Sequence, residues 1–171
     1  MILTLAEAAR IMGAFDTPQV NPECEFSAVA TDSRAVQQGE LFFCLPGENF
    51  DGHGFAADAM TKGACGLVIS QPVDVEDVPL IMVRDTLQSL GLLAAHVRSR
   101  FEGQVIAVTG SAGKTTVKED LASTMSQKFK TARSYKNFNN QLGLPLSIMG
   151  FEGDEDIWVL EAGISIMGDM D

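Results

Sequence analysis

The sequence predicts an α/β protein of two domains, because short apolar runs alternate along the chain with stretches of helical periodicity. Each apolar run is four or five residues long and is bounded by glycine, proline or acidic residues, as buried strands of parallel sheets are. The alternation stops at a charged cluster, Arg98, Arg100 and Glu102, and restarts at Gly103 with a new strand and helix. The 171 residues suffice for one full domain or two small ones.

The first part of the chain is predicted to hold three helices and four strands. Apolar residues recur at helical spacing over 4–12 and stop at Gly13, which indicates a short opening helix. A second helix is expected over 55–62, ended by Gly63, and a third runs from Thr86 to the charged cluster. The four strands are expected at 26–30, 41–45, 66–69 and 80–83.

The second part opens with a strand, a glycine-rich loop and a polar helix. The strand covers 105–108, the loop lies within 109–116, and the helix continues to about Lys128. A further buried strand is expected over 157–160. Two strands and one long helix are fewer elements than a nucleotide-binding sheet usually holds, so we expect the second domain to be truncated. The two domains are expected at 1–102 and 103–171.

The composition argues against several classes of function. With 12 Lys and Arg against 23 Asp and Glu, the formal net charge is -11, which disfavours binding to nucleic acid or anionic lipid. Cys24, Cys44 and Cys65 lack the spacing of metal ligands and predict neither a disulfide framework nor a zinc site. There is no signal-peptide pattern and no apolar run approaching about 18 residues. We therefore expect a cytoplasmic protein with no nucleic-acid partner and no membrane span.

The strongest signal for chemistry is the loop Thr109-Gly-Ser-Ala-Gly-Lys-Thr-Thr116. Glycine amides can surround phosphate oxygens, the helix N-terminus adds a favourable dipole, the lysine can contact β- and γ-phosphates, and the threonine hydroxyl can ligate Mg²⁺. The usual pattern has glycine at position 108, where Val108 stands. The alternative is a glycine turn that begins a helix with a solvated lysine. The predicted ATP-binding residues are Gly110, Ser111, Ala112, Gly113, Lys114, Thr115 and Thr116.

Glu161 is a second candidate, because it ends the strand predicted over 157–160. A carboxylate at the carboxyl end of a parallel strand, in the same sheet as a phosphate loop, can ligate Mg²⁺ or position a water. The alternative is a surface acid that ends a strand. Of the cations between residues 114 and 136, only Lys114 is assigned to phosphate, and most of the others are interpreted as a solvated helix face: Lys118, Lys128, Lys130, Arg133 and Lys136.

An amide-rich segment follows these cations. Three of its four residues from 137 to 140 are asparagines, Asn137, Asn139 and Asn140, and Gly143 and Pro145 follow. Asparagine both donates and accepts hydrogen bonds, so the segment can bind a peptide or phosphate. An ordinary Asn-rich turn with a helix cap explains it equally well.

Together these residues resemble the Mur ligase family, ATP-dependent enzymes that add amino acids or a dipeptide to the peptidoglycan precursor. The loop 109–116 is similar to that family's version, which also lacks the glycine at position 108. Three segments of the first part resemble the family's uridine-nucleotide-binding domain: Thr31-Asp-Ser-Arg34, Gly39 to Leu45 and Gly47 to Phe55. The resemblance covers nearly the whole chain. It implies an N-terminal UDP-sugar-binding α/β domain followed by the start of a P-loop, Rossmann-like ATP-binding domain.

The resemblance also implies roles for individual residues. Lys114 and Glu161 would be catalytic, with Lys114 on the γ-phosphate of ATP, and Thr115 together with Glu161 would place Mg²⁺. The substrate-binding residues implied are Ser33, Arg34 and His53 near the UDP-sugar, and Asn137, Asn139 and Asn140 along the path of the acceptor peptide. Without the resemblance, Arg34 is equally a solvated turn residue, His53 a loop histidine and His96 a helix-packing histidine.

Within the family, the segment 137–145 resembles members that join D-alanyl-D-alanine to UDP-MurNAc-tripeptide. The implied reaction is attack of the tripeptide carboxylate on the γ-phosphorus of ATP, followed by amide formation from the acyl phosphate. We expect this chain to be an N-terminal fragment that acts as a monomer and binds substrates without efficient turnover. The alternatives are another Mur-type amide ligase, a relative of folylpolyglutamate synthase, and a non-catalytic nucleotide-binding module.

Overall fold

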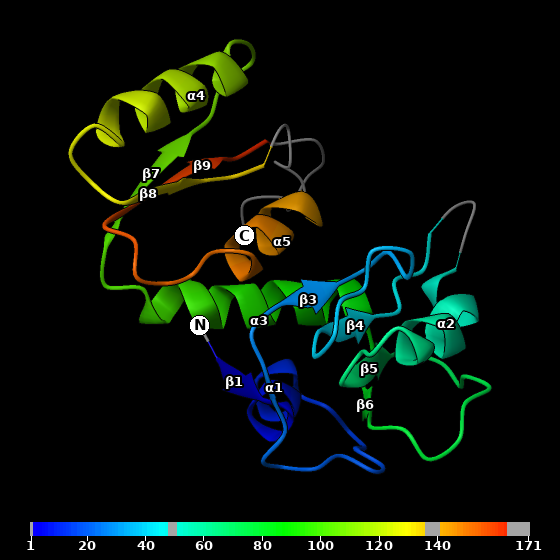
Figure 1. The fold of residues 1–171 in the computed structure, drawn as a ribbon. Helices are drawn as coiled ribbons and strands as arrows, with labels where there is room; N and C mark the ends of the chain where they lie inside the picture. Colours follow the sequence, from blue (N-terminus) through cyan, green and yellow to red (C-terminus); the bar gives the residue numbers. More distant parts are fainter. Residues whose placement is uncertain (1, 48–50, 136–140, 164–171) are drawn as a thin grey trace. The chain divides into compact units, whose positions relative to one another are not determined.

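The computed structural model describes all residues except 1, 48–50, 136–140 and 164–171, and it divides into two compact units, Met1–Leu93 and Ala94–Asp171 (Figure 1). The predicted α/β class is confirmed, because both units carry parallel sheets with helices. The division falls within the long helix α3 (Thr86–Arg100), whereas the sequence led us to expect it after residue 102. None of the helices in the described parts of the chain has the length and apolarity needed to cross a membrane.

The N-terminal unit contains a four-stranded sheet in the order β3-β4-β5-β6, with every neighbouring pair parallel. Strands β4 and β5 are buried at each residue, as the central strands of a parallel sheet are. Ala30, Phe42, Leu67 and Leu80 are paired in one row across the four strands. The strands are β3 (Val29–Ala30), β4 (Leu41–Phe43), β5 (Gly66–Ile69) and β6 (Leu80–Met82).

The first helix of the N-terminal unit begins where local hydrogen bonds cap it. Helix α1 (Leu5–Met12) begins after Thr4, whose hydroxyl accepts from the Glu7 amide at 3.1 Å while the Glu7 carboxylate accepts from the Thr4 amide at 3.0 Å. The 3-10 helix η1 (Gly52–Phe55) leads directly into α2 (Ala56–Thr61). Buried alanines of α2 join the apolar core formed by strands β4 and β5.

One predicted strand, over 26–30, is divided in the structure. Its first part is β2 (Glu25–Phe26), which pairs antiparallel with β1 (Leu3–Thr4), and its second part is β3. The chain changes partner between them, since the Ala28 carbonyl already accepts from the Leu41 amide at 3.1 Å. An apolar run predicts burial at each position but does not reveal where a strand changes its partner.

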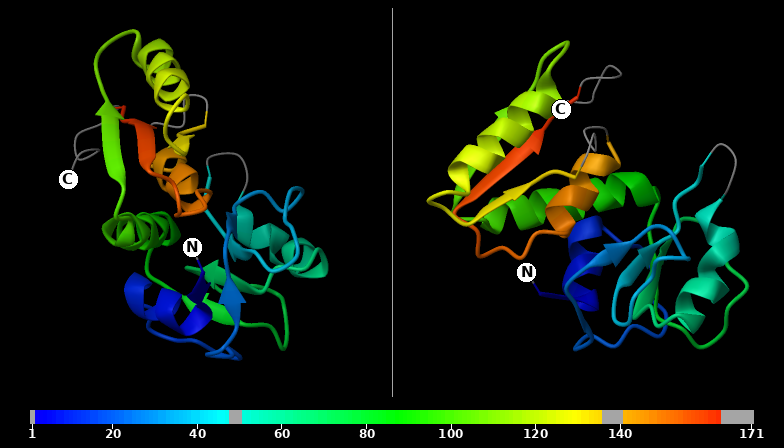
Figure 2. Two further views of the ribbon diagram at one scale, coloured as in Figure 1. Left: turned by 60° about the vertical axis from the view of Figure 1, so that its left-hand side comes forward. Right: turned by 45° about the horizontal axis from the view of Figure 1, so that its top comes forward.

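The C-terminal unit is a three-stranded parallel sheet in the order β7-β9-β8, with α4 (Lys114–Met125) on one face (Figure 2). Side chains of β9 alternate between the two faces. Ile157 and Val159 pack with Ala122 of α4, whereas Trp158 stacks on Phe101 with ring centroids 3.8 Å apart. The strands are β7 (Gln104–Val108), β8 (Thr131–Arg133) and β9 (Ile157–Glu161).

Two elements of this unit were not predicted, strand β8 and helix α5 (Gly143–Met149). Strand β8 is only three residues long and none of them is fully buried, so it lacks an apolar pattern. Helix α5 begins with Gly143 and carries Pro145, residues that indicate a turn. Pro145 is tolerated there because it lies in the first turn, where backbone amides have no partner within the helix.

Candidate functional site

The glycine-rich loop connects β7 to α4, and residues 109–113 are all exposed. Gly110 has a φ of 146° and Gly113 a φ of 77°, conformations that residues with a side chain rarely adopt. Gly113 directly precedes α4, so the loop ends at the positive end of the helix dipole. The Lys114 ammonium group donates to the Gly110 carbonyl at 2.8 Å, which holds the side chain back over the loop.

Glu161 lies beside this loop because β7 and β9 are adjacent and parallel. It is the last residue of β9 and pairs with Val108, the last residue of β7. The Thr115 hydroxyl donates to Glu161 Oε2 at 2.8 Å, and the Glu161 residue is only 1% exposed. A hydroxyl and a carboxylate oxygen are the hard ligands that Mg²⁺ prefers, so this pair fits the metal that the loop motif implies.

Lys118 is the residue of this region that sequence reasoning missed, since it was grouped with the solvated cations. Its side chain is 0% exposed. Its ammonium group donates to the Ser134 carbonyl at 2.9 Å and lies 3.2 Å from Glu119 Oε1 and 3.9 Å from Glu161 Oε2. The sequence did indicate that Lys118 could lie near the site. Residues three positions apart on a helix share a face, and Lys118 follows Thr115 by three.

Ser134 links this buried lysine to the strand that carries the carboxylate. Its hydroxyl accepts from the Glu161 amide at 2.9 Å, while its carbonyl accepts from Lys118. On the exposed side, Glu119 also binds the Arg133 guanidinium at 2.7 Å. A continuous polar network therefore supports the Thr115 and Glu161 pair from beneath.

A second group of carboxylates in the described part of this unit is close enough to hold a metal: Glu152, Asp154 and Glu155. The Lys130 ammonium group already pairs with two of them, at 2.6 Å from Glu152 and 2.5 Å from Asp154, and this lowers the pKa of Asp154. Burial would raise the pKa of Glu155, but the Trp158 indole and three backbone amides hydrogen-bond to it and lower it. These ion pairs and hydrogen bonds already engage all three carboxylates, so we interpret the group as structural.

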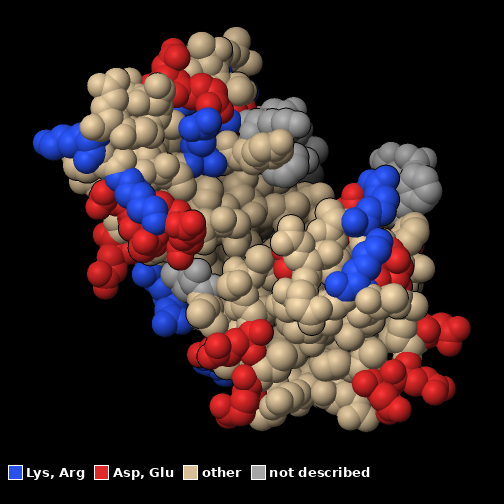
Figure 3. Space-filling view, in the orientation of Figure 1, with Lys and Arg blue, Asp and Glu red and all other residues tan. Residues whose placement is uncertain are grey.

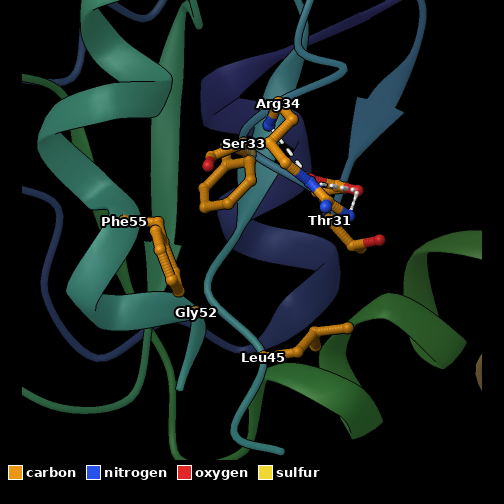
Figure 4. A pocket seen from close by; sticks show the side chains of 8 residues that line it. Thr31, Ser33, Arg34, Leu45, Gly52 and Phe55 are labelled. Carbon is orange, nitrogen blue, oxygen red and sulfur yellow. Dashed lines mark hydrogen bonds and ion pairs between the residues drawn. The ribbon is translucent and has the colours of Figure 1, made fainter. Parts of the chain in front are cut away.

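The N-terminal unit contains a pocket of about 470 Å³ at the carboxyl ends of β3 and β4 (Figure 4). Ligands of open α/β sheets bind at this edge. Figure 4 shows Arg34 and Thr31 on one side of the pocket and Phe55 on the other, with Leu45 toward the bottom of the view. The lining residues are Thr31, Asp32, Ser33, Arg34, Phe42, Leu45, Gly52 and Phe55, which include two predicted substrate-binding residues.

Arg34 is held in place by its neighbour. Its guanidinium donates to both carboxylate oxygens of Asp32, at 2.7 to 3.2 Å, and this hydrogen bonding lowers the pKa of Asp32 to about 2. The Arg34 side chain remains 85% exposed, so its outer edge can still meet an anion. Ser33 is buried, and its carbonyl accepts a hydrogen bond from the Lys62 ammonium group at 2.8 Å. Hydrogen bonding from the Ser33 hydroxyl lowers the pKa of Asp58.

His53 does not line the pocket, although the sequence predicted that it binds substrate. Its ring is buried, with Nδ1 2.6 Å from Asp51 Oδ1 and Nε2 accepting from the Ser70 amide at 3.0 Å. Both ring nitrogens are thus engaged within the protein. Local sequence gave no sign of Ser70, which lies 17 residues away. The other predicted substrate residues, Asn137, Asn139 and Asn140, lie outside the described residues.

Charge is distributed unevenly along the chain. Residues 1–102 contain six cationic and fourteen acidic side chains, and residues 103–171 contain six and nine. On the face seen in Figure 3, groups of acidic side chains lie along the margins of the N-terminal unit. The pocket residue Arg34 therefore lies in a part of the chain with a net negative charge. This favours a local contact with one anionic group over binding to an extended anionic partner.

Comparison with known domain families gives two matches. Residues 25–119 match the family described as Mur ligase family, catalytic domain, and residues 108–171 match the Mur ligase middle domain. The first match covers more than half of the chain, including the pocket residues and the phosphate loop.

Similar proteins include the UDP-N-acetylmuramoyl-tripeptide–D-alanyl-D-alanine ligases of Escherichia coli and Bacillus subtilis. The first is 41% identical over 143 residues, covering 84% of this chain and 31% of the relative. The second is 36% identical over 166 residues, covering 96% of this chain and 36% of the relative. The chain thus spans about a third of the length of the curated relatives that it matches.

Similar solved structures include MurF proteins of two organisms. A crystal structure of MurF from Acinetobacter baumannii has a TM-score of 0.90 and 31% identity, covering 99% of this chain and 38% of that chain. The MurF ligase of Thermotoga maritima, in complex with ADP, has a TM-score of 0.75 and 34% identity, covering 84% of this chain and 33% of that one.

Proposed function

Because this chain belongs to the Mur ligase family, we propose that it forms the N-terminal third of an ATP-dependent ligase that joins D-alanyl-D-alanine to UDP-MurNAc-tripeptide. The similar ligases of E. coli and B. subtilis carry that activity in their names. The observation that carries the proposal is the Thr115 to Glu161 hydrogen bond beside an exposed glycine loop, because it joins the two oxygen ligands that a magnesium nucleotide requires.

The C-terminal unit would bind the nucleotide. The exposed amides of residues 110–113 would surround the β-phosphate, and Lys114 would exchange its contact with the Gly110 carbonyl for a γ-phosphate oxygen. Thr115 and Glu161 would hold Mg²⁺, with Lys118 supporting the carboxylate. When bound, Mg²⁺ supplies charge neutralisation of the phosphates. The T. maritima relative was solved in complex with ADP, which supports a nucleotide-binding role.

The N-terminal unit would bind the uridine nucleotide of the second substrate. Its pocket of about 470 Å³ is within the usual range for small-molecule sites, roughly 300–1,000 Å³. Arg34 offers the charge that a diphosphate needs, and the exposed ring of Phe55 offers a flat apolar wall for a base. The proposal places this substrate domain at 1–102 and the nucleotide domain from residue 103 onward.

The reaction that follows is two-step amide formation. The terminal carboxylate of the tripeptide attacks the γ-phosphorus of ATP, and the bond to the β-γ bridging oxygen breaks to release ADP. The amine of D-alanyl-D-alanine then attacks the acyl carbon, and phosphate leaves. Positioning and charge neutralisation carry most of phosphoryl transfer, so the contribution of this chain is to hold both substrates through Lys114 and the pocket. The activity belongs to cytoplasmic peptidoglycan precursor synthesis, and the ligase would act as a monomer.

A calorimetric titration tests the substrate half of the proposal. The chain is titrated with UDP-MurNAc-tripeptide, with UDP-MurNAc-dipeptide and with UDP alone. Binding of all three, tightest for the tripeptide, is the expected result. Arg34→Ala is expected to weaken UDP binding about tenfold, the loss of one charge-assisted contact, whereas Arg84→Ala, an exposed arginine outside the pocket lining, should leave it unchanged. Absence of binding to every uridine ligand by a folded chain would overturn the assignment of the N-terminal unit.

A further inference from the structure

The turn Asp51-Gly52-His53 contributes Gly52 to one wall of the N-terminal pocket, yet its histidine is engaged with other parts of the protein. His53 is 7% exposed and is not among the lining residues, whereas Gly52 before it and Phe55 after it are. The imidazole lies between Asp51 and Ser70, the residue that directly follows strand β5. A ring in this position connects the turn to the sheet.

The contacts of the ring define its protonation. The Ser70 backbone amide can only donate, so Nε2, which lies 3.0 Å from it, must be the unprotonated acceptor. A neutral imidazole then carries its proton on Nδ1, which donates to Asp51 Oδ1 at 2.6 Å. Asp51 is fixed in turn, because it accepts from the His53 amide at 2.9 Å and from the Gln71 side chain at 2.6 Å. These hydrogen bonds hold His53 in a single tautomer.

The same turn is packed against the end of strand β4. The Gly52 amide donates to the Leu45 carbonyl at 2.9 Å. A Cβ atom on Gly52 would lie 2.7 Å from the Leu45 backbone nitrogen, closer than real Cβ atoms come to backbone. Leu45, Gly52 and Phe55 all line the pocket. The position of this wall therefore depends on how firmly the turn is held against the sheet.

We propose that His53 is a positioning residue for the pocket and not a ligand contact: as a neutral Nδ1-protonated imidazole, it fastens the turn 51–55 to the end of strand β5 and so sets the wall formed by Gly52 and Phe55. The identity of the ligand, a uridine nucleotide, rests on the proposed function. The placement of the wall does not.

Nuclear magnetic resonance of the imidazole nitrogens tests the tautomer directly, and the chain has only two histidines, so His96→Gln identifies the signals of His53. The expected spectrum shows a protonated Nδ1 and an unprotonated Nε2 for His53, unchanged when UDP is added. A protonated Nε2, or a switch of the proton between nitrogens on addition of UDP, would overturn the proposal.

Hydrogen exchange at the backbone amides tests the positioning role without any ligand. His53→Ala is expected to speed exchange at Gly52 and Ser70 at least tenfold while leaving Val159, in the other unit, unchanged. His53→Gln retains an acceptor near the Nε2 position and should restore most of the protection. Unaltered exchange at Gly52 in His53→Ala would refute the positioning role.

The effect on the pocket is then measured by UDP titration of the same variants. His53→Ala should weaken UDP binding about tenfold, because the buried Ser70 amide loses its acceptor. His53→Gln should weaken it by less than about threefold, because the glutamine side chain keeps an acceptor for that amide. Equal losses in both variants would indicate a direct ligand contact and contradict the proposal. If the unaltered chain binds no UDP while the exchange result holds, the proposed function is wrong and the role of His53 in the wall stands.

Discussion

The phosphate loop of the C-terminal unit and the pocket of the N-terminal unit are assembled in opposite ways. The loop takes its residues from one stretch, 109–116, and Glu161 joins it from a distant part of the chain. The pocket draws its lining from three separate stretches within residues 31–55, which the parallel strands bring to one edge of the sheet. We infer that substitutions in the loop act locally, whereas the pocket is sensitive to residues that never touch its ligand.

The largest effect is expected from the buried lysine beneath the loop. Lys118→Met removes the cation from a site shared with Glu119 and Glu161 and leaves buried carboxylate charge behind, which typically costs about 3–5 kcal/mol. Chemical denaturation should show this loss in the free energy of unfolding. The matched control is Lys128→Met, an exposed lysine that should change stability by less than about 0.5 kcal/mol. Equal stability of the two variants would show that the buried network contributes nothing.

The pocket wall provides the next largest effect. Gly52→Ala forces a methyl group against the Leu45 backbone, and overpacking of this kind costs about 1–3 kcal/mol. UDP binding should be lost while Mg-ADP binding persists. Gly54→Ala is the control, because no atom lies within 4 Å of a Cβ placed there. Loss of UDP binding in both variants would point to general flexibility of the turn and not to the contact with Leu45.

A smaller effect is expected from the hydroxyl that meets Glu161. Thr115→Ala should weaken binding of Mg-ADP about tenfold, since one oxygen ligand and its hydrogen bond are removed. Thr115→Ser keeps the hydroxyl and should bind nearly as well as the unaltered chain. Fluorescence titration with a labelled ADP measures both. Similar weakening by serine would assign the effect to packing of the lost methyl group.

The smallest effect concerns pH. The pKa of Glu155 is lowered from 4.5 in the folded state by the Trp158 indole and backbone amides, which outweigh burial, so its carboxylate stabilises the fold above pH 4.5. That stabilisation is lost as the pH falls below 4.5 through the folded-state pKa. Glu155→Gln should lower Tm at neutral pH by a few degrees, the scale of about 1 kcal/mol. The difference from the unaltered chain should shrink in acid, and a constant difference across pH would contradict this assignment.

The comparison of the two sites also explains what sequence could predict. The loop was recognisable because its chemistry needs contiguous residues, and the sheet order then placed Glu161 beside it. Strands with uninterrupted apolar runs, such as β5 and β9, were located within a residue or so. Both cases depend on local patterns, which a sequence displays directly.

The features that the sequence did not predict depend on contacts between residues far apart in the chain. The division of 26–30 into β2 and β3 follows from partners that lie elsewhere in the chain. Lys118 looked solvated because its helix is otherwise polar, and only the neighbouring strand ends show that it is buried. The substrate role of His53 was implied by the family resemblance, whereas its acceptor role toward the Ser70 amide is visible only in three dimensions.

We propose that the chain carries two independent sites, a uridine-nucleotide pocket and a magnesium-nucleotide loop. The most direct test is to titrate UDP and Mg-ADP separately and together into the unaltered chain, Arg34→Ala and Thr115→Ala. We expect that both ligands bind at once, that Arg34→Ala weakens only UDP binding and that Thr115→Ala weakens only Mg-ADP binding. Competition between the ligands, or a loss of both in either variant, would contradict it.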